Sequence, residues 1–149
     1  MLVFCLAAVL AIPAVAAPDG DGAVRPARHV ARIGLSKPEQ KAYRVFVRQL
    51  IEEKNPERAY ESMASKDMIQ HQPPFGENRE STIKQWLTMS TKPRSRFVPV
   101  SIHFDGDIAI TNFHGFLDAG EPGADVTIRD RIKGGKIVEE WGEFHPMPR

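Results

Sequence analysis

Two carboxylates near the end of the chain are the strongest candidates for chemistry. Asp130 and Glu140 lie in the segments 126–132 and 137–144, where apolar and polar residues alternate. This period of two predicts strands, in which every second side chain faces the same side. Gly134-Gly135 between them is typical of a hairpin turn, so we expect the two strands to pair.

The register of this hairpin decides what surrounds the carboxylates. We favour a three-residue turn with a glycine bulge, which pairs residue 132 with 136 and sets Arg129 opposite Glu139 on the exposed face. The covered face then carries both carboxylates among apolar residues, namely Val126, Ile128, Asp130, Ile132, Val138, Glu140 and Phe144. A two-residue turn would pair 133 with 136 and bring other residues to the covered face: Ile137, Glu139, Trp141 and Glu143.

A carboxyl group on an apolar face has a raised pKa, and a like-charged neighbour raises it further. Such a group can serve as a general acid or base near neutral pH. The alternative is that Asp130 and Glu140 lie at strand ends, where water solvates them or where Arg131 and Lys136 pair with them.

Further polar residues stand in suggestive places. His71 lies in the proline-rich loop 69–76 and could polarise a carbonyl or shuttle a proton, or its ring could bond to backbone and fix the loop. Asn112 and His114 alternate with Ile108, Ile110 and Phe116, so we expect them either to line an apolar pocket or to be satisfied polar groups of the core.

Composition excludes several classes of function. The net charge of +1 shows no excess of Lys and Arg for nucleic acid. The histidines at 71, 103, 114 and 145 lack the spacing of a metal site, and no glycine-rich phosphate loop follows a strand. We therefore predict no metal, no nucleotide and no other cofactor.

The first residues differ from the rest of the chain. Residues 1–17 are uncharged and apolar, and Ala14-Val15-Ala16 fits a signal-peptide cleavage site. We predict a signal peptide at 1–16, a flexible lead-in at 17–35 and an exported, periplasmic or secreted protein with no stable membrane span after cleavage. Retention of the segment as a short anchor is the alternative. The single cysteine, Cys5, lies in this segment, so the mature chain would have no disulfide.

Local signals predict helices first and strands afterwards. Ser36 and Glu39 form a capping box for a helix that ends near Lys54. Asn55-Pro56 begins a second helix through about Met63, and a third runs over 80–89. Strands are expected at 97–104, 108–117, 126–132 and 137–144, with Val98, Val100, Ile102 and Phe104 on one face. Four antiparallel strands covered on one side by helices make an α+β fold.

Two short motifs resemble those of the SnoaL-like polyketide cyclase family, in the nuclear-transport-factor-2-like (NTF2-like) superfamily. Ile69-Gln70-His71-Gln72-Pro73 resembles the family's I-Q-H-N-P loop, and Arg79-Glu80 its G-R-E segment. Arg131 with 135–141 resembles the tail R-x-x-D-G-K-I-V-E-H-W-D. The resemblance covers about residues 37 to 146, within a domain expected at 36–149.

The resemblance implies a cone-shaped α+β barrel with a cystatin-like fold, in which three helices close over a strongly bent antiparallel sheet. They enclose an apolar pocket, so the resemblance implies a small apolar molecule as the ligand. It also implies a homodimer through the outer face of the sheet, where we expect Phe113, Ile137 and Trp141.

Family members with known chemistry are polyketide cyclases, and ketosteroid isomerase shares the fold. The cyclases' acid and base positions match Ile128 and Gly142, which are inert here, and the family's tail histidine is Glu140. If acid–base chemistry is retained, we expect Asp130 or Glu140 as the base and His71 as the donor to an enolate oxygen, with Asn112, His114, Phe116 and Ile128 around the substrate.

The reaction would then be enolisation of an apolar carbonyl compound, followed by cyclisation or isomerisation, as in a lyase or isomerase. The alternative is a non-catalytic, exported ligand-binding or dimerisation module of the same fold.

Overall fold

The computed structural model describes residues 34–118 and 121–148. The expected signal peptide at 1–16 lies outside these residues, as does the lead-in apart from its last two residues. None of the helices in the described ranges is long and apolar enough to cross a membrane.

The helices begin where the capping signals place them. Ser36 caps α1 (Lys37–Val47) through the expected capping box with Glu39, and a π-helical segment η1 (Arg48–Glu52) continues it. Asn55 caps α2 (Pro56–Met63), and Asn78 caps α3 (Arg79–Ser90). The three predicted helices are confirmed.

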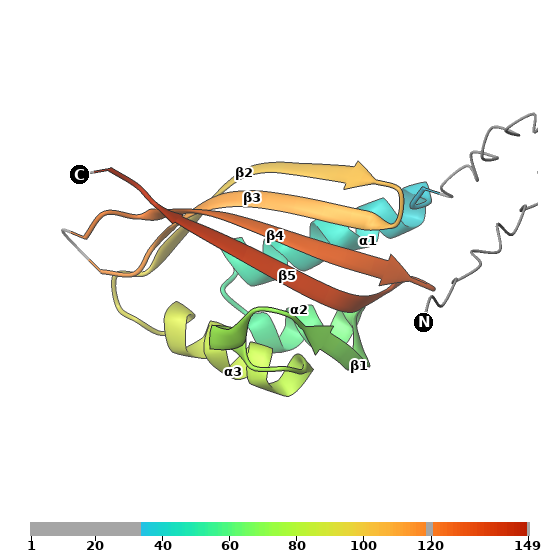
Figure 1. The fold of residues 1–149 in the computed structure, drawn as a ribbon, viewed down its shortest axis with the longest axis horizontal. Coiled ribbons are helices and arrows are strands. Elements are labelled where there is room, and N and C mark those ends of the chain that lie inside the picture. Colours follow the sequence, from blue (N-terminus) through green and yellow to red (C-terminus); the bar gives the residue numbers. More distant parts are fainter. Residues whose placement is uncertain (1–33, 119–120, 149) are drawn as a thin grey trace, which may run out of the picture. The chain divides into compact units, whose positions relative to one another are not determined.

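The sheet has five strands in the order β1-β5-β4-β3-β2 (Figure 1). Four of them are the expected antiparallel series: β2 (Arg96–Asp105), β3 (Ile108–Phe116), β4 (Ala124–Lys133) and β5 (Lys136–Pro146). The fifth, β1 (Ala64–Gln70), pairs parallel to β5. The expectation of a purely antiparallel, four-stranded sheet was therefore wrong. The α+β class with a bent sheet is confirmed, although the sheet is open and does not close into a barrel.

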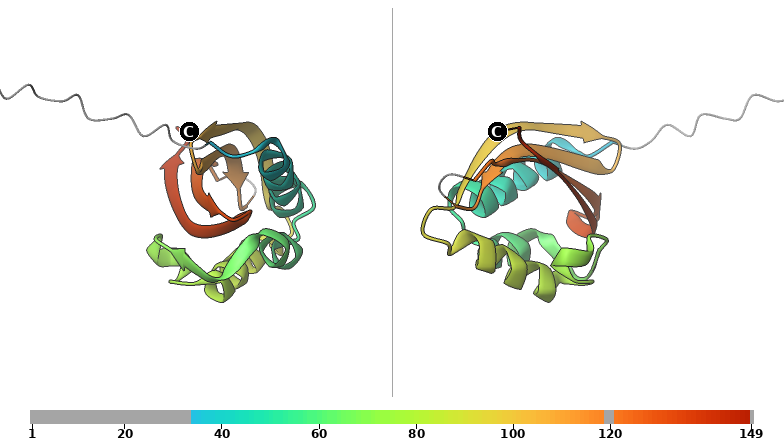
Figure 2. Two further views of the ribbon diagram at one scale, coloured as in Figure 1. Left: turned by 90° about the vertical axis from the view of Figure 1, so that its right-hand side faces the viewer. Right: turned by 60° about the vertical axis from the view of Figure 1, so that its left-hand side comes forward.

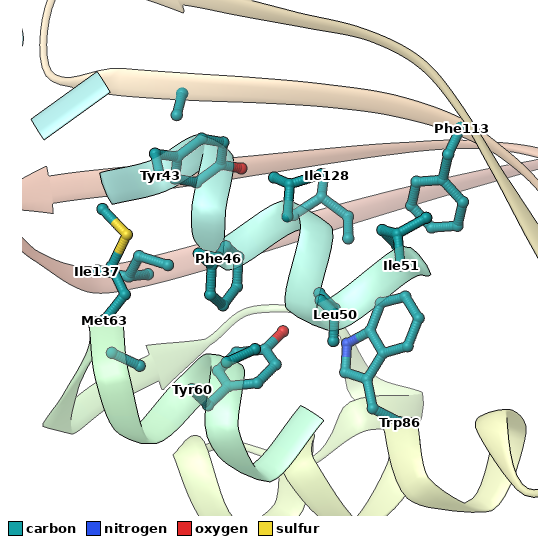
Figure 3. Packing of buried hydrophobic residues seen from close by; sticks show 14 of the residues in the cluster. Tyr43, Phe46, Leu50, Ile51, Tyr60, Met63, Trp86, Phe113, Ile128 and Ile137 are labelled. Atoms are coloured by element: carbon teal, nitrogen blue, oxygen red, sulfur yellow. The ribbon is translucent and has the colours of Figure 1, made fainter. Parts of the chain in front are cut away.

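The described helices lie on the inner side of the bent sheet (Figure 2). Their apolar side chains meet those of β3, β4 and β5 in one core (Figure 3). Among the largest buried side chains are Tyr43, Phe46, Tyr60 and Trp86, each at most 1% exposed. The sheet surface that faces these helices is called the inner face below, and the opposite surface the outer face.

The last hairpin differs from the register that we favoured. Its turn has two residues, with Lys133 paired with Lys136, and both turn glycines have positive φ, at 57° and 74°. The irregularity comes one step later, between Arg131 and Ile132, so Arg131 faces Glu139 and Asp130 faces Glu140. This bulge restores the expected face for both carboxylates.

The two-residue turn also places Ile137 opposite Ile132 on the inner face, where Ile137 is 0% exposed. Phe113 is likewise buried, so neither residue lies on the outer face, where we expected them in a dimer interface. Trp141, by contrast, is on the outer face beside Arg129 and Arg131.

The expected faces of β2 and β3 were wrong in part. On β3 the buried residues are Ala109, Thr111 and Phe113, so the isoleucines at 108 and 110 turn outward. On β2 a register shift between Pro99 and Ser101 leaves Val98 and Val100 exposed, while Ile102 and Phe104 pack against the core.

Candidate functional site

Asp130 and Glu140 are directly opposite each other on β4 and β5, on the inner face of the sheet. Asp130 is 0% exposed and Glu140 is 3% exposed. Of the two alternatives, solvated strand ends and an apolar face, the structure has the buried arrangement. Because an unpaired charge is costly inside a protein, the partners of these groups decide their state.

Three side chains donate hydrogen bonds to the carboxyl pair. The hydroxyl of Tyr43, on α1, donates to Asp130 Oδ2 at 2.6 Å. The hydroxyl of Tyr60, on α2, donates to Glu140 Oε2 at 2.7 Å, and Gln70 Nε2, at the end of β1, donates to Glu140 Oε1 at 2.6 Å. Both oxygens of Glu140 are thus satisfied by donors, as an ionised carboxylate requires.

The fourth oxygen of the pair identifies where a proton lies. Asp130 Oδ1 is buried and has no hydrogen-bond donor among the described residues. A proton on Asp130 satisfies this oxygen, because it can then donate to the Glu140 carboxylate. We therefore assign the pair one proton, held by Asp130, and one negative charge, on Glu140.

The pKa shifts follow the same logic. Burial raises the pKa of Asp130 well above its usual range, and the charge of Glu140 raises it further, while the Tyr43 hydrogen bond works in the opposite direction. Burial also raises the pKa of Glu140, against hydrogen bonds from Tyr60, Gln70 and Asp130 that lower it. Burial and the neighbouring carboxyls raise the pKa of both tyrosines, so they remain protonated donors.

A small apolar cavity of about 50 Å³ lies on the same inner face. Neither carboxyl group belongs to its lining. The lining is entirely apolar and consists of Trp86, Met89, Phe97, Phe113, Gly115, Leu117, Ala124, Val126 and Phe144. Pockets for drug-sized ligands measure about 300–1,000 Å³, so this cavity admits a short apolar group.

One row of residues separates the cavity from the carboxyl pair. Along the paired strands β4 and β5, the inner-face rows are Val126 with Phe144, Ile128 with Gly142, and Asp130 with Glu140. The first row lines the cavity and the third is the carboxyl pair. The middle row contains the two positions that resemble the acid and base positions of the cyclases.

The Gln72 side chain fills the space above Gly142. A Cβ atom on residue 142 would overlap Gln72 Oε1 and would lie 2.9 Å from its Cδ. The loop that carries Gln72 also brings Phe75 against two residues of the cavity lining, with ring centroids 5.9 Å from Trp86 and 6.0 Å from Phe144.

His71 does not join the carboxyl pair. Its ring stacks on Trp141 with centroids 4.6 Å apart and planes 2° apart, and its Nε2 lies 3.1 Å from Glu139 Oε2, on the outer face. Only its backbone N–H reaches toward the pair's strand, donating to the Glu140 carbonyl oxygen at 2.9 Å. His71 cannot donate to an enolate held at Asp130 or Glu140 in this arrangement.

The expected substrate residues divide between the two faces. Asn112 Nδ2 donates to Ser101 Oγ at 3.0 Å and its Oδ1 accepts from Thr127 Oγ1 at 2.8 Å, which makes it a satisfied polar group between strands. His114 pairs with Asp125 at 2.7 Å. Both lie on the outer face, so the expectation that they share a pocket with the carboxylates was wrong.

Phe116 packs against an arginine outside the cavity. Its ring lies 4.5 Å from the guanidinium carbon of Arg96. Ile128 is on the inner face, is 5% exposed, and separates the cavity from Asp130.

Sequence reasoning missed Tyr43, Tyr60, Gln70 and Gln72. A signal for the tyrosines existed, because each lies on the apolar face of a helix, where a buried hydroxyl needs a partner. The role of Gln72 depends on a glycine 70 residues away in the chain. In the described ranges, no three His, Cys, Asp or Glu residues are close enough to hold a metal ion.

No family model matches the sequence, and no curated protein matches it. Solved structures do. An NTF2-like protein of unknown function from Mesorhizobium loti is 20% identical, over 74% of this chain and 93% of that one, with a TM-score of 0.61. A protein described as a SnoaL-like polyketide cyclase, from Jannaschia sp. CCS1, is 13% identical over 74% and 90% of the two chains, with a TM-score of 0.57. IdmH from Streptomyces antibioticus, also described as a polyketide cyclase, is 18% identical over 68% and 90%, with a TM-score of 0.53.

The chain therefore has the NTF2-like fold, and SnoaL-like cyclases are among the proteins that share it. At these identities the likeness defines the architecture, and the activity must be argued from the side chains.

Proposed function

We propose that this domain binds a small, neutral, apolar molecule in the cavity lined by Trp86, Phe113 and Val126, and that it does so without acid–base catalysis. The observation that carries the proposal is the separation of binding space from titratable groups. The cavity lining is apolar throughout, and the carboxyl pair is closed off behind Ile128 and Gln72. Burial of apolar surface, at about 25 cal/mol per Å², would supply the affinity.

Gly115 offers a variant that tests the cavity directly. A Cβ atom on residue 115 would meet Val126 Cγ2 at 3.6 Å and ring atoms of Phe97 and Phe113 at 3.8 Å, which are ordinary contacts. Gly115→Ala should therefore fold and reduce the cavity. Gly34→Ala is the matched control, since its Cβ would meet only the Gly106 carbonyl oxygen, at 3.9 Å.

The measurement is thermal stabilisation by a series of 2-alkanones from butanone to nonanone. A ligand stabilises a protein by about 2.7 kcal/mol at a hundredfold excess over its dissociation constant. We expect shorter ketones to stabilise the wild type and Gly34→Ala, and to stabilise Gly115→Ala much less. Equal stabilisation of all three proteins would refute binding in this cavity.

A second function is acid–base catalysis on an apolar carbonyl compound. It is favoured by the proton on the carboxyl pair, which a single row of residues separates from the cavity. The same ketones test it in D₂O. Enolisation by Asp130 or Glu140 would exchange α-hydrogens for deuterium, and Asp130→Asn would abolish the exchange. Ketone binding without hydrogen exchange would refute catalysis and support binding as the only function of the cavity.

Two expectations about the whole protein stay predictions. Export would be tested by the N-terminal sequence of the protein from its native host, which should begin after Ala16. Homodimerisation through the outer face would be tested by light scattering, with Trp141→Arg as the variant expected to give monomers.

A further inference from the structure

We propose that Gln72 is a side-chain gate that sets the depth of the apolar cavity. With its carboxamide above Gly142, the cavity ends before the row of Ile128; with the carboxamide displaced, it extends to Asp130 and Glu140. This inference rests on the proposed function, because it concerns which ligands the same cavity accepts.

The spacing of residues along the strands sets the distance between the cavity and the carboxyl pair. Side chains on one face of a strand are two residues apart, which is about 6.5 Å. The row that lines the cavity, Val126 with Phe144, and the carboxyl pair are therefore about 13 Å apart, with one row between them. One methylene chain of moderate length would span the distance if the middle row were open.

The two halves of the middle row differ in mobility. Ile128 is 5% exposed and belongs to a central strand paired on both sides, so it is fixed. Gly142 contributes no side chain, and the space above it is occupied by the end of Gln72. Among the described residues the Gln72 carboxamide forms no hydrogen bond, and the side chain is only partly buried. Rotation of Gln72 about its own bonds would thus open the row without breaking a polar contact.

The chemistry beyond the gate selects the ligand. The pair presents a carboxyl proton on Asp130 and a carboxylate on Glu140, with no cation among the side chains bonded to them. A neutral carbonyl or hydroxyl oxygen can share that proton as a second acceptor beside the Glu140 carboxylate, whereas an anionic head group would meet the charge of Glu140. The open gate therefore fits an apolar chain that ends in one neutral hydrogen-bond acceptor, such as a methyl ketone.

The gate can be tested without a natural ligand by labelling with N,N′-diisopropylcarbodiimide, an apolar reagent for protonated carboxyl groups. The acid O–H adds across one C=N bond, and the acyl group then migrates to nitrogen, giving a stable N-acylurea that needs no further reactant. Peptide mass spectrometry locates the adduct. Gln72→Ala should be labelled at Asp130 or Glu140 at least about tenfold faster than the wild type, equal to about 1.4 kcal/mol of easier access.

Two controls separate the gate from loss of stability. Gln85→Ala makes the same change at a half-buried glutamine of α3 outside the cavity lining and should label like the wild type. Ala59→Gly lowers stability by about 1 kcal/mol within α2, without touching the row. If Gln72→Ala labels no faster than Ala59→Gly, the gate is refuted.

The 2-alkanone series then separates the gate from the proposed function. We expect Gln72→Ala to bind longer ketones than the wild type accepts. Faster labelling with no ketone binding to either protein would refute the proposed function and leave the gate standing. Ketone binding with an unchanged labelling rate would refute the gate and leave the proposed function standing.

Discussion

Replacing Asp130 by asparagine tests the assignment of the shared proton. The carboxamide has the shape of a protonated carboxyl: its oxygen can accept from Tyr43, and its NH₂ group can donate to Glu140. The variant therefore keeps the hydrogen bonds of the folded state. Above about pH 4, the wild type must take up a proton at Asp130 when it folds, because this carboxyl group is ionised in the unfolded chain. Asp130→Asn folds without this proton uptake.

The sign and size of the effect follow from linkage. The pKa of Asp130 in the unfolded chain is close to 3.8, and in the folded protein it is raised well above this value. Between these two pKa values the folded state binds more protons at Asp130, so the contribution of Asp130 to stability is greatest below about pH 4 and declines as pH rises. The decline is about 1.4 kcal/mol per pH unit for one proton. Asp130→Asn lacks this contribution, so it should gain on the wild type by about that amount for each unit above pH 4 until the pair titrates.

Urea unfolding, followed by tryptophan fluorescence between pH 4 and 8, measures this difference directly. The exposed carboxylates of Glu39 and Glu143, whose pKa values hydrogen bonds lower, have the opposite pH dependence, but they are the same in both proteins and cancel. Parallel stability curves for the wild type and Asp130→Asn would show that Asp130 is not the protonated member and would refute the reasoning.

Glu140→Gln is the matched comparison within the pair. Both Glu140 oxygens accept hydrogen bonds, from Tyr60 and Gln70, so an NH₂ group in place of one oxygen would face a donor. A buried polar group without a partner costs about 1–3 kcal/mol, and we expect Glu140→Gln to be destabilised by this amount at pH 5. Equal effects of the two amide substitutions would contradict an asymmetric pair.

Two further predictions concern the periphery of the site. Ser36→Ala removes the side-chain half of the capping box of α1 and should lower the free energy of unfolding by about 1 kcal/mol in urea titrations; no change would mean that Glu39 alone caps the helix. His71→Ala removes the ring stacked on Trp141 from the outer face. It should leave ketone binding unchanged and cost at most about 1.5 kcal/mol of stability; a loss of binding would place His71 in the ligand site.

Local chemistry explains which elements could be predicted. Ser36 with Glu39, and Asn55 with Pro56, determine helix starts within a few residues, so these boundaries agree with the structure. The segment that forms β1 follows α2 without a turn residue, and its apolar residues, Ala64, Met68 and Ile69, give no period of two. Its pairing with β5 depends on residues 70 positions away, which no local pattern records.

The faces of β3 show why side-chain polarity alone fails. Ala109, Thr111 and Phe113 lie in the core, while Ile108 and Ile110 turn outward. The more apolar set of side chains on β3 therefore faces away from the core. Thr111 is buried because its hydroxyl lies 3.0 Å from the Tyr43 hydroxyl, a tertiary contact. The covered face of Asp130 and Glu140 was predictable, because their two strands carry apolar residues on that face. Their direct pairing and their hydrogen-bond donors were not, since these depend on the bulge and on the helices.

The parallel pairing of β1 with β5 also bears on how the domain folds. β5 is the last strand of the described chain, yet it lies between β1 and β4. The side chains of Tyr60 and Gln70 donate hydrogen bonds to Glu140, and they come 80 and 70 positions before it in the sequence. Contacts at such sequence separation form slowly, because a long loop must close before they are made. The helices and the β2–β3–β4 meander can associate first. Until β5 inserts, β1 and β4 each have a free edge, and the carboxyl site does not exist.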